Sequence, residues 1–145
     1  MRLLALDVGD RRTGVAVGEW IARPLTTLKR RSKAEDFAAI ARLLQEQQAQ
    51  RLVVGLPINM DGTLGFQAQR VTRYAERLEC ALIEMGLDVE VVLWDERLTT
   101  SEAIEQTAHR RRSARRGHVD AAAAAVILQS YLDAQPSPLS DGTEQ

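Results

Sequence analysis

Cysteine and histidine are scarce in this 145-residue chain, and their scarcity excludes several kinds of site. The single cysteine, Cys80, cannot supply an internal disulfide framework or a Cys-based zinc site. Two histidines, His109 and His118, leave little for a His-rich metal centre. The longest apolar run, from Ala121 to Leu128, is too short to span a bilayer, and the first residues lack a secretory apolar region. The sequence therefore predicts a cytoplasmic protein that does not associate with a membrane.

Positive charge is unevenly distributed along the chain. The net charge is −1, which is not typical of a surface coated with basic residues for nucleic acid. Five arginines nevertheless fall within seven residues that hold no acid: Arg110, Arg111, Arg112, Arg115 and Arg116. The guanidinium group matches phosphate in a bidentate manner, so residues 109–117 are expected to form a loop that binds phosphates. A solvated loop without such a role is the alternative.

The composition, 45% hydrophobic and 27% charged, is that of a globular protein, and the length suits one domain. We expect a single domain over residues 1–134. Residues 135–145 contain two prolines and almost no apolar side chains, so a disordered C-terminal tail is expected there.

Hydrophobic periodicity predicts an α/β fold. Apolar or alternating runs predict strands at residues 2–8, 13–20, 24–28, 52–56 and 88–94. Helices are expected from a capping box at Ser32 and Glu35, over residues 65–85 and 119–132, and in a short segment opened by Thr99. Cys80 falls among the core spacings of the second long helix and is expected to be buried. The order of elements predicts an antiparallel hairpin joined to parallel βαβ units.

Acidic residues stand at the ends of three of these elements. Asp7 ends the first strand, Asp95 and Glu96 close the fifth, and Asp120 lies in the first turn of the last helix. Sites in such sheets form where loops leave the carboxyl ends of the strands. Asp95 and Glu96 alternate in direction, so only one of them faces such a site. The simpler interpretations are a hydrogen-bonded turn at Asp7, a solvated strand end with Arg97 as its ion partner, and helix-dipole stabilisation at Asp120.

The last helix is expected to bring Asp120 toward the strand ends. Its alanines, Ala121 to Ala125, allow close packing on a sheet, and the expected sheet-facing stripe is Asp120, Ala123, Ala124, Ile127 and Tyr131. Clustered carboxylates repel one another unless a cation holds them. Oxygen ligands without His or Cys suit Mg²⁺ or Mn²⁺, and such sites commonly hydrolyse phosphate esters.

Four segments carry a family pattern: Leu6–Gly14, Val54–Gly62, Trp94–Thr100, and Val119–Asp120 with the alanine-rich helix that ends at Leu132. Together they resemble the YqgF family of RNase H-like proteins, also called RuvX, over Arg2 to Asp133. The Gly-Leu-Pro-Ile-Asn-Met-Asp-Gly and Asp-Glu-Arg-Leu-Thr-Thr stretches are the most specific parts. The Asp-x-Gly start is weaker, because actin-type and sugar-kinase ATPases share it.

The resemblance implies an RNase H-like fold, with a five-stranded mixed sheet in the order 3-2-1-4-5 flanked by helices. It implies a nuclease whose acidic set is Asp7, Glu96 and Asp120, with Mg²⁺ or Mn²⁺ as the metal. Members are described as Holliday junction resolvases and as nucleases that mature the 5′ end of pre-16S ribosomal RNA, and we favour the second description. The implied partners are nucleic acid and ribosomal particles.

Two positions depart from related sequences. The related RuvC resolvases place an acid where the fourth strand here has Gly55, so the second carboxylate must come from Glu96. We hypothesise that the missing side chain at Gly55 lets Glu96 reach inward. Many family members flank the final acid with basic residues, whereas this chain has residues 118–121, His-Val-Asp-Ala, in that place. His118 either replaces a phosphate contact, assists the leaving oxygen, or is a capping or surface residue.

Further residues are candidates for substrate contact. The expected phosphate-binding set is Arg12, Arg97 and the arginines of residues 110–116. Asn59 and Asp61 form a candidate substrate loop, and the alternative is a tight turn needed only for chain reversal. Thr99 and Thr100 are expected to cap a helix, and either could also touch substrate.

Three other functions remain open from the sequence. A Holliday junction resolvase would act as a two-fold homodimer in order to cut symmetrically. A non-catalytic RNA- or ribosome-binding factor would keep the fold and the arginine loop but would not need Asp7. A phosphate-binding module of the ATPase type is disfavoured, because such ATPases enclose nucleotide with a second domain. Phosphate contacts do not distinguish RNA from branched DNA.

Overall fold

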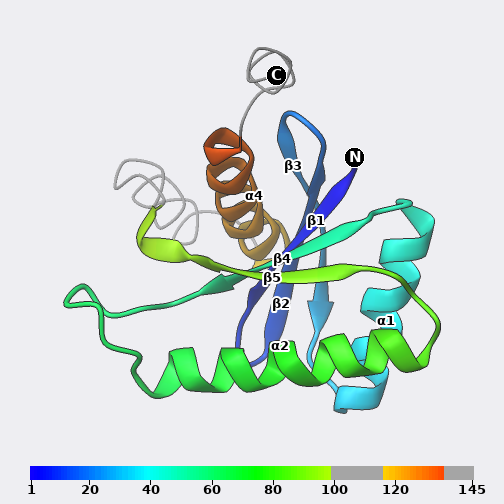
Figure 1. Ribbon diagram of the computed structural model, residues 1–145, viewed down its shortest axis with the longest axis horizontal. Helices are drawn as coiled ribbons and strands as arrows, with labels where there is room; N and C mark the ends of the chain where they lie inside the picture. Colours follow the sequence, from blue (N-terminus) through cyan, green and yellow to red (C-terminus); the bar gives the residue numbers. More distant parts are fainter. Residues whose placement is uncertain (99–115, 136–145) are drawn as a thin grey trace, which may run out of the picture.

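The computed structural model describes residues 1–98 and 116–135. At its centre is a five-stranded sheet in the order β3-β2-β1-β4-β5 (Figure 1). The strands are β1 (Leu3–Val8), β2 (Arg12–Gly18), β3 (Ala22–Lys29), β4 (Arg51–Leu56) and β5 (Glu90–Asp95). β2 is antiparallel to both β1 and β3, whereas β4 and β5 run parallel to β1. The expected mixed sheet and strand order are confirmed, and each strand begins and ends within two residues of its expected bounds.

Helices cover both faces of the sheet. Helices α1 (Lys33–Glu46) and α2 (Phe66–Glu84) pack on one face, and α4 (Arg116–Ala134) packs on the other (Figure 1). A single 3-10 turn, η1 (Glu96–Leu98), follows β5. Within the described ranges, no helix combines the length and the apolar character needed to cross a bilayer.

Helix α1 begins at the expected capping box. The Ser32 hydroxyl accepts a hydrogen bond from the Glu35 backbone N–H at 3.1 Å and donates one to Glu35 Oε1 at 3.0 Å. The cap satisfies one of the amide groups that a helix N-terminus leaves unpaired. The spacing of Phe37, Ile40 and Leu44 then puts all three on the buried face of the helix.

Two expectations about helices are wrong. The last helix begins at Arg116, so Arg116 and Gly117 form its first turn and do not end a loop. A glycine inside a helix costs only about 1 kcal/mol relative to alanine, which the alanine-rich segment after it offsets. Cys80 is exposed, because α2 buries Leu78 and Leu82 and the intervening position 80 falls on the outer side of the helix.

Several expected features lie outside the described residues. They are the short helix opened by Thr99, with Thr100, the arginines Arg110, Arg111, Arg112 and Arg115, and residues 136–145 of the expected tail.

The side chains of β1 alternate between two cores. Leu4 and Leu6 pack with residues of α1 and α2, whereas Leu3 and Ala5 pack with residues of α4. Because successive side chains of a strand point to opposite faces, Asp7 belongs to the α4 face. The sheet therefore directs this carboxylate toward the helix that carries Asp120.

Helix α4 packs on this face through small and aliphatic side chains. The buried residues are Ala121, Ala122, Ala124, Ile127, Leu128 and Tyr131. The expected stripe is correct at Ala124, Ile127 and Tyr131, but Ala123 is only partly buried. The helix is rotated slightly from the expected orientation, because Leu128 offers more apolar area to the core than Ala123 does.

Candidate active site

Asp7 lies between two glycines in the sheet. In the antiparallel β1–β2 pair, Asp7 is directly opposite Gly14. In the parallel β1–β4 pair, Leu6 is opposite Val54, and one further step of that register sets Gly55 beside Asp7. Neither neighbour carries a side chain, so β2 and β4 place no side chain of their own directly beside the partly buried Asp7 on the α4 face.

The backbone of Asp120 fills the space at Gly14. A Cβ atom at Gly14 would lie 1.8 Å from the carbonyl oxygen of Asp120 and 2.9 Å from the backbone nitrogen of Ala121. Helix α4 therefore comes closer to β2 than any side chain at position 14 permits. The alanine-rich helix packs as tightly as its composition predicts, and the backbone that approaches Gly14 is that of the acidic residue Asp120 itself.

The side chain of Glu96 fills the corresponding space at Gly55. A Cβ atom at Gly55 would lie 2.7 Å from Glu96 Oε1 and 3.2 Å from Glu96 Cγ. The Glu96 carboxylate thus extends over the end of β4, on the face that carries Asp7. This contact meets the expectation that the glycine makes room for Glu96.

Ser130 of α4 forms hydrogen bonds with residues on both sides of Glu96. The Trp94 indole N–H donates a hydrogen bond to the Ser130 hydroxyl at 3.1 Å, and this hydroxyl donates to the Leu98 carbonyl at 3.2 Å. The Trp94 ring also meets Tyr131 edge-to-face, with 5.1 Å between ring centroids. Residues on both sides of Glu96 are therefore held to one turn of α4.

Asp95 pairs with Arg97 instead of facing the Asp7 side. Arg97 Nη2 lies 2.8 Å from Asp95 Oδ2, and the Arg97 backbone N–H donates to Asp95 Oδ1 at 2.8 Å. The hydrogen bonds from the Arg97 side chain hold the pKa of Asp95 below its usual range. Arg97, an expected phosphate-binding residue, is engaged in the local ion pair that was its alternative interpretation.

This ion pair predicts a stability difference that depends on pH. Because folding lowers the pKa of Asp95, the pair stabilises the fold above the unfolded pKa of about 4 and loses this effect as pH falls through the folded value. Arg97→Ala is expected to lower Tm slightly at pH 7, and the difference from wild type should shrink by pH 3. Thermal melts at both pH values test this. An equal difference at both would contradict it, and Arg42→Ala, an exposed arginine of α1, is the control.

The 59–63 turn satisfies its own polar groups. Asp61 Oδ1 accepts hydrogen bonds from the Thr63 hydroxyl at 2.6 Å and from the Thr63 backbone N–H at 3.0 Å, and the hydroxyl bond lowers the pKa of Asp61. The Asn59 side-chain amide donates to the same hydroxyl at 3.0 Å. Gly62 adopts a positive φ of 89° that glycine tolerates best. These bonds match a tight turn, the alternative interpretation of Asn59 and Asp61.

Arg12 opens β2 beside the Asp7 edge. Its backbone carbonyl accepts the Gly9 N–H at 2.9 Å and closes the β1–β2 turn. Alternation along β2 gives the Arg12 side chain the same face as Gly14, and therefore as Asp7. Arg12 is thus a cationic group on the carboxylate face.

The acidic residues fit a weakly held hard cation better than a closed metal cage. Among residues 1–98 and 116–135, no three His, Cys, Asp or Glu side chains converge closely enough to hold a metal ion. The donors of Asp7, Glu96 and Asp120 are all oxygens, which suit Mg²⁺ or Mn²⁺. Mg²⁺ is commonly bound by one or two carboxylates, with waters and substrate phosphates as its other ligands. The donor chemistry fits that pattern.

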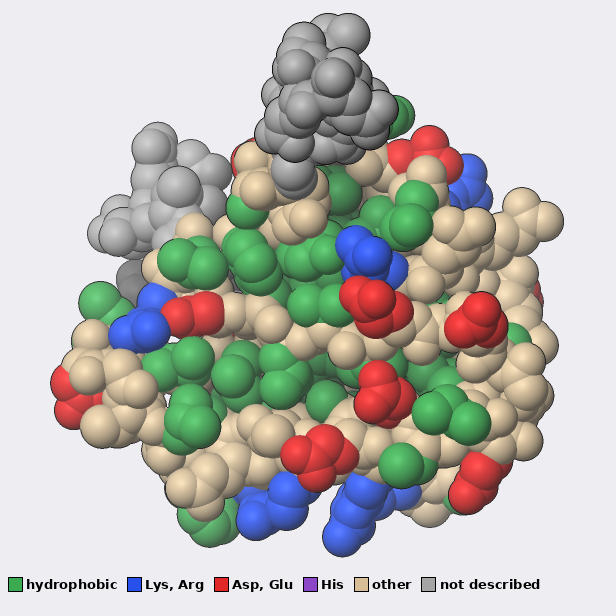
Figure 2. Space-filling view, viewed as in Figure 1, with side chains coloured by type: hydrophobic (Ala, Val, Ile, Leu, Met, Phe, Trp, Pro, Cys, Tyr) green, Lys and Arg blue, Asp and Glu red, His purple; other side chains and the backbone are tan. Residues whose placement is uncertain are grey.

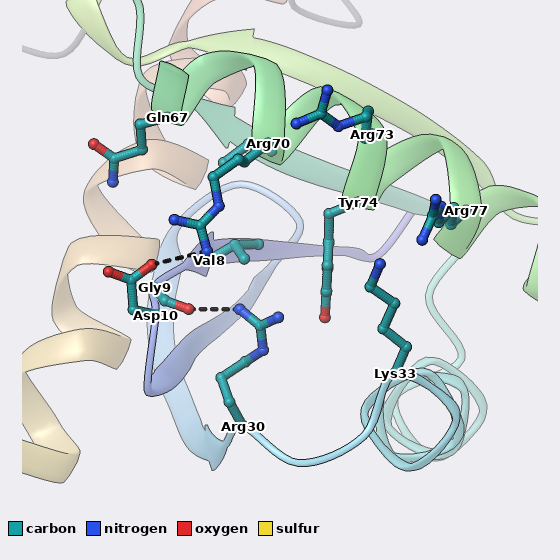
Figure 3. A pocket seen from close by; sticks show the side chains of 11 residues that line it. Val8, Gly9, Asp10, Arg30, Lys33, Gln67, Arg70, Arg73, Tyr74 and Arg77 are labelled. Carbon is teal, nitrogen blue, oxygen red and sulfur yellow. Dashed lines mark hydrogen bonds and ion pairs between the residues drawn. The ribbon is translucent and has the colours of Figure 1, made fainter. Parts of the chain in front are cut away.

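A basic pocket on the opposite face of the sheet was not expected from the sequence. Its lining includes Arg30, Lys33, Arg70, Arg73 and Arg77 (Figure 3). In Figure 2, Lys and Arg side chains project from the lower edge of the molecule, where Figure 1 places α2. The available signal was the spacing of three arginines along α2, at steps of three and four residues, which puts them on one helix face.

Comparison with protein families settles the relationship suggested by these residues. The family model RuvX, described as a Holliday junction resolvase, matches residues 1–134. The chain belongs to the RuvX family. RuvX proteins are nucleases of the resolvase type, so this chain is an enzyme of the nuclease class.

Curated relatives in the RuvX family carry a consistent name. A protein of Thermoanaerobacter pseudethanolicus is 44% identical over 141 residues, which cover 93% of this chain and 98% of the relative. A protein of Anaeromyxobacter dehalogenans is 51% identical over 138 residues, with 92% and 97% covered. Both are named "Putative pre-16S rRNA nuclease".

Solved structures support the fold of this RuvX chain. RuvC of T. thermophilus in complex with a Holliday junction substrate aligns with a TM-score of 0.62 at 17% identity, covering 90% of this chain and 92% of RuvC. The resolvase of Fowlpox virus, in complex with Holliday junction DNA, aligns with a TM-score of 0.53 at 11% identity, covering 92% and 97%. With the 3-2-1-4-5 sheet, these likenesses establish the RNase H-like fold.

Proposed function

We propose that this protein hydrolyses phosphodiester bonds of nucleic acid at the carboxyl end of β1, with a divalent metal ion, and that its substrate is the 5′ region of pre-16S ribosomal RNA. One observation carries the proposal. Asp7 stands between Gly14 and Gly55, and the spaces at these glycines are filled by the backbone of Asp120 and the side chain of Glu96. The nuclease family and the names of the curated relatives support the activity and the substrate.

Asp7, Glu96 and Asp120 would hold the metal ion. When bound, such an ion acts as a Lewis acid that activates water and neutralises charge on phosphate oxygens. Arg12, on the same face as Asp7, binds a phosphate oxygen and orients the strand across the carboxylates. Ser130, through Trp94 and Leu98, keeps Glu96 over Gly55 and limits the number of orientations its carboxylate adopts.

The substrate assignment rests on the relatives, which share 41–51% identity with this chain in the alignments that carry the pre-16S name. Processing of that RNA would place the protein in the cytoplasm on ribosomal particles. A Holliday junction resolvase is the second candidate, because the RuvX family model carries that description. That function requires a two-fold homodimer, since the two strands must be cut symmetrically.

A cleavage assay with purified protein tests the proposal. A pre-16S 5′ fragment and a four-way DNA junction are each incubated with Mg²⁺, Mn²⁺ or EDTA. We expect cleavage of the RNA with either metal and none with EDTA. Paired symmetric cuts in the junction alone would instead identify a resolvase. Binding of the RNA without cleavage under every metal condition would identify a non-catalytic RNA-binding factor.

Gly55→Ala is expected to reduce cleavage while the protein stays folded. The new methyl group would displace the Glu96 carboxylate, which lies 2.7 Å from its position, and press on Ile127 Cδ1 at 2.6 Å. Both contacts are ends of flexible side chains, so the structure can adjust at a cost of about 1–3 kcal/mol. We expect at least a tenfold lower rate, because the displaced carboxylate no longer faces the Asp7 side.

A double-mutant cycle shows whether the loss acts through Glu96. If it does, Gly55→Ala should add little to the loss caused by Glu96→Gln, because coupled residues are not additive. If the two substitutions instead reduce the cleavage rate by independent factors that multiply in the double variant, Gly55 does not act through Glu96.

A further inference from the structure

A pocket lies under α2, on the face of the sheet opposite Asp7. Its volume is about 220 Å³, and it opens beside Val8 and Gly9 at the end of β1 (Figure 3). Three arginines reach it from α2, and Arg30 and Lys33 reach it from the start of the α1 region. Asp7 and Val8 are consecutive residues, so one step along β1 separates the pocket from the proposed carboxylate site.

The positive charge of the pocket is only partly neutralised. Arg30 Nε lies 3.0 Å from Oδ2 of the buried Asp36, and Arg70 Nη2 lies 3.4 Å from Asp10 Oδ1. The remaining three cations, Lys33, Arg73 and Arg77, form no salt bridge within the described ranges.

Clustering these cations costs stability in the absence of an anion. Arg73 and Arg77 are four residues apart on α2, and like charges at that spacing destabilise a helix. A bound anion would reduce that repulsion and accept hydrogen bonds from the guanidinium groups of the arginines. The arrangement is therefore more favourable when the pocket is occupied than when it is empty.

The Tyr74 hydroxyl provides an independent indication of a ligand. Tyr74 lines the pocket, is only 5% exposed, and its hydroxyl has no hydrogen-bond partner of normal geometry in the described residues. The Thr13 hydroxyl lies beside it, is also buried, and is likewise unpaired among those residues. Figure 3 shows the Tyr74 hydroxyl pointing between Arg30 and Lys33. Buried polar groups of this kind are rare and usually have a ligand or water as partner.

The tyrosine is suited to donate a hydrogen bond to an anion. Burial raises its pKa to about 12, against a smaller lowering by Arg30, whose guanidinium lies 5.0 Å from the centre of the Tyr74 ring. The phenol is therefore protonated at neutral pH. Its proton, the guanidinium groups and the Lys33 ammonium are all donors.

We propose that this pocket binds a phosphate group of the nucleic-acid substrate, where the strand crosses the edge of the sheet from the carboxylate face to the α2 face. The proposal rests on the proposed function in that it takes nucleic acid as the substrate. A volume of about 220 Å³ holds a phosphate but is below the roughly 300–1,000 Å³ of pockets that enclose whole small molecules. The base and the sugar therefore stay outside the pocket, which contacts only the phosphate backbone.

Binding measured without cleavage tests the pocket separately from the reaction. A labelled single-stranded RNA of about twelve nucleotides is titrated in EDTA, at several salt concentrations, with wild type and with the double variant Arg73→Ala/Arg77→Ala. We expect at least a tenfold weaker Kd. The slope of log K against log salt should fall by about 0.7 for each phosphate that the variant no longer neutralises. The matched control, Arg23→Ala/Arg42→Ala, removes two exposed arginines outside the pocket and should bind within about twofold of wild type.

Tyr74→Phe separates a ligand-binding role from a structural one. Because no hydrogen bond of normal geometry holds this hydroxyl within the described residues, although the Thr13 hydroxyl lies beside it, its removal should change Tm little. Loss of a hydrogen bond to a charged phosphate should still weaken RNA binding about tenfold. A lower Tm with unchanged RNA affinity would overturn the assignment.

Other outcomes discriminate between the two proposals. If the pocket and control double variants lose RNA affinity equally, the arginines act only through their charge, and the pocket proposal is overturned. Saturable binding of ATP or inorganic phosphate that does not compete with RNA would assign it to a free phosphate compound instead. If wild type cleaves neither nucleic acid but the pocket variant binds RNA more weakly, the cleavage proposal fails and the pocket stands. If wild type cleaves RNA but the pocket variant binds RNA as tightly as wild type, the cleavage proposal stands and the pocket proposal fails.

Discussion

Gly14→Ala is expected to destabilise the protein by about 3 kcal/mol, at the upper end of the cost of overpacking a core. The added methyl carbon would lie 1.8 Å from the Asp120 carbonyl oxygen and 2.2 Å from its carbonyl carbon. Both partners are backbone atoms, so no side-chain rotation relieves the overlap. Either α4 moves away from β2 or the strand bends. Both responses also shift Asp120 away from Asp7, so cleavage should fall with stability.

Urea denaturation measures this loss, and Gly86→Ala is the matched control. Gly86 has a positive φ of 81°, and a methyl group added there would meet no atom within 4 Å, so alanine brings backbone strain without overlap. That strain costs about 1–2 kcal/mol. If Gly14→Ala is no less stable than Gly86→Ala, the close approach of α4 to β2 does not exist in solution.

Asp7→Asn is expected to lower the cleavage rate about 10³-fold while the fold is retained. A neutral amide cannot hold a divalent cation as a carboxylate does, and such an ion supplies several kcal/mol of transition-state stabilisation. At 1.36 kcal/mol for each factor of ten, that loss corresponds to about three orders of magnitude. The fold should be retained, because the amide has the shape of the carboxylate and its lack of charge reduces repulsion from Glu96 and Asp120.

Initial rates at saturating Mg²⁺ and thermal melts provide the two measurements. The control is Asp88→Asn, which makes the same chemical change at an exposed position before β5 and should leave both quantities unchanged. An Asp7→Asn protein that keeps more than a tenth of the wild-type rate would remove Asp7 from the proposed acidic set. If wild type and Asp7→Asn bind the RNA equally and neither cleaves it, the protein is a binding factor.

The predictable parts of this protein are those that depend on neighbours in the chain. The capping box at Ser32, the apolar stripe of α2 and the apolar strands follow from local spacing, and the structure confirms them. Local spacing was less reliable where a helix face had to be chosen. Cys80 and Ala123 were assigned to buried stripes, and both are more exposed than expected. One helical step of about 100° separates an inner from an outer position.

The family resemblance pointed to Glu96 rather than Asp95, and only the tertiary structure supplies a physical reason for that choice. Asp95 is the last residue of β5 and Glu96 comes directly after it, and alternation requires only that they point to opposite faces. Which face carries the site depends on Gly55, which is forty-one residues before Glu96 in the chain and beside β5 in the sheet. The strand register that brings them together arises from long-range pairing and cannot be read from spacing.

The basic pocket was beyond local analysis for the same reason. The arginines of α2 form a visible pattern, but an arginine stripe is usually a solvated face. Its partners Arg30 and Lys33 lie about forty residues earlier, and the unpaired hydroxyl of Tyr74 becomes apparent only after the core is packed.

The sequence by itself determined the α/β class, the RuvX family and the candidate acids Asp7, Glu96 and Asp120, because these depend on residue types in a fixed order. The tertiary structure decided which residues, distant in the sequence, lie close together. It set Asp7 between two glycines, turned Glu96 rather than Asp95 toward it, and formed a basic pocket one residue away on the other face. The physical reason is that a sheet brings distant segments within about 5 Å of one another, and the register of that pairing is a property of the whole fold.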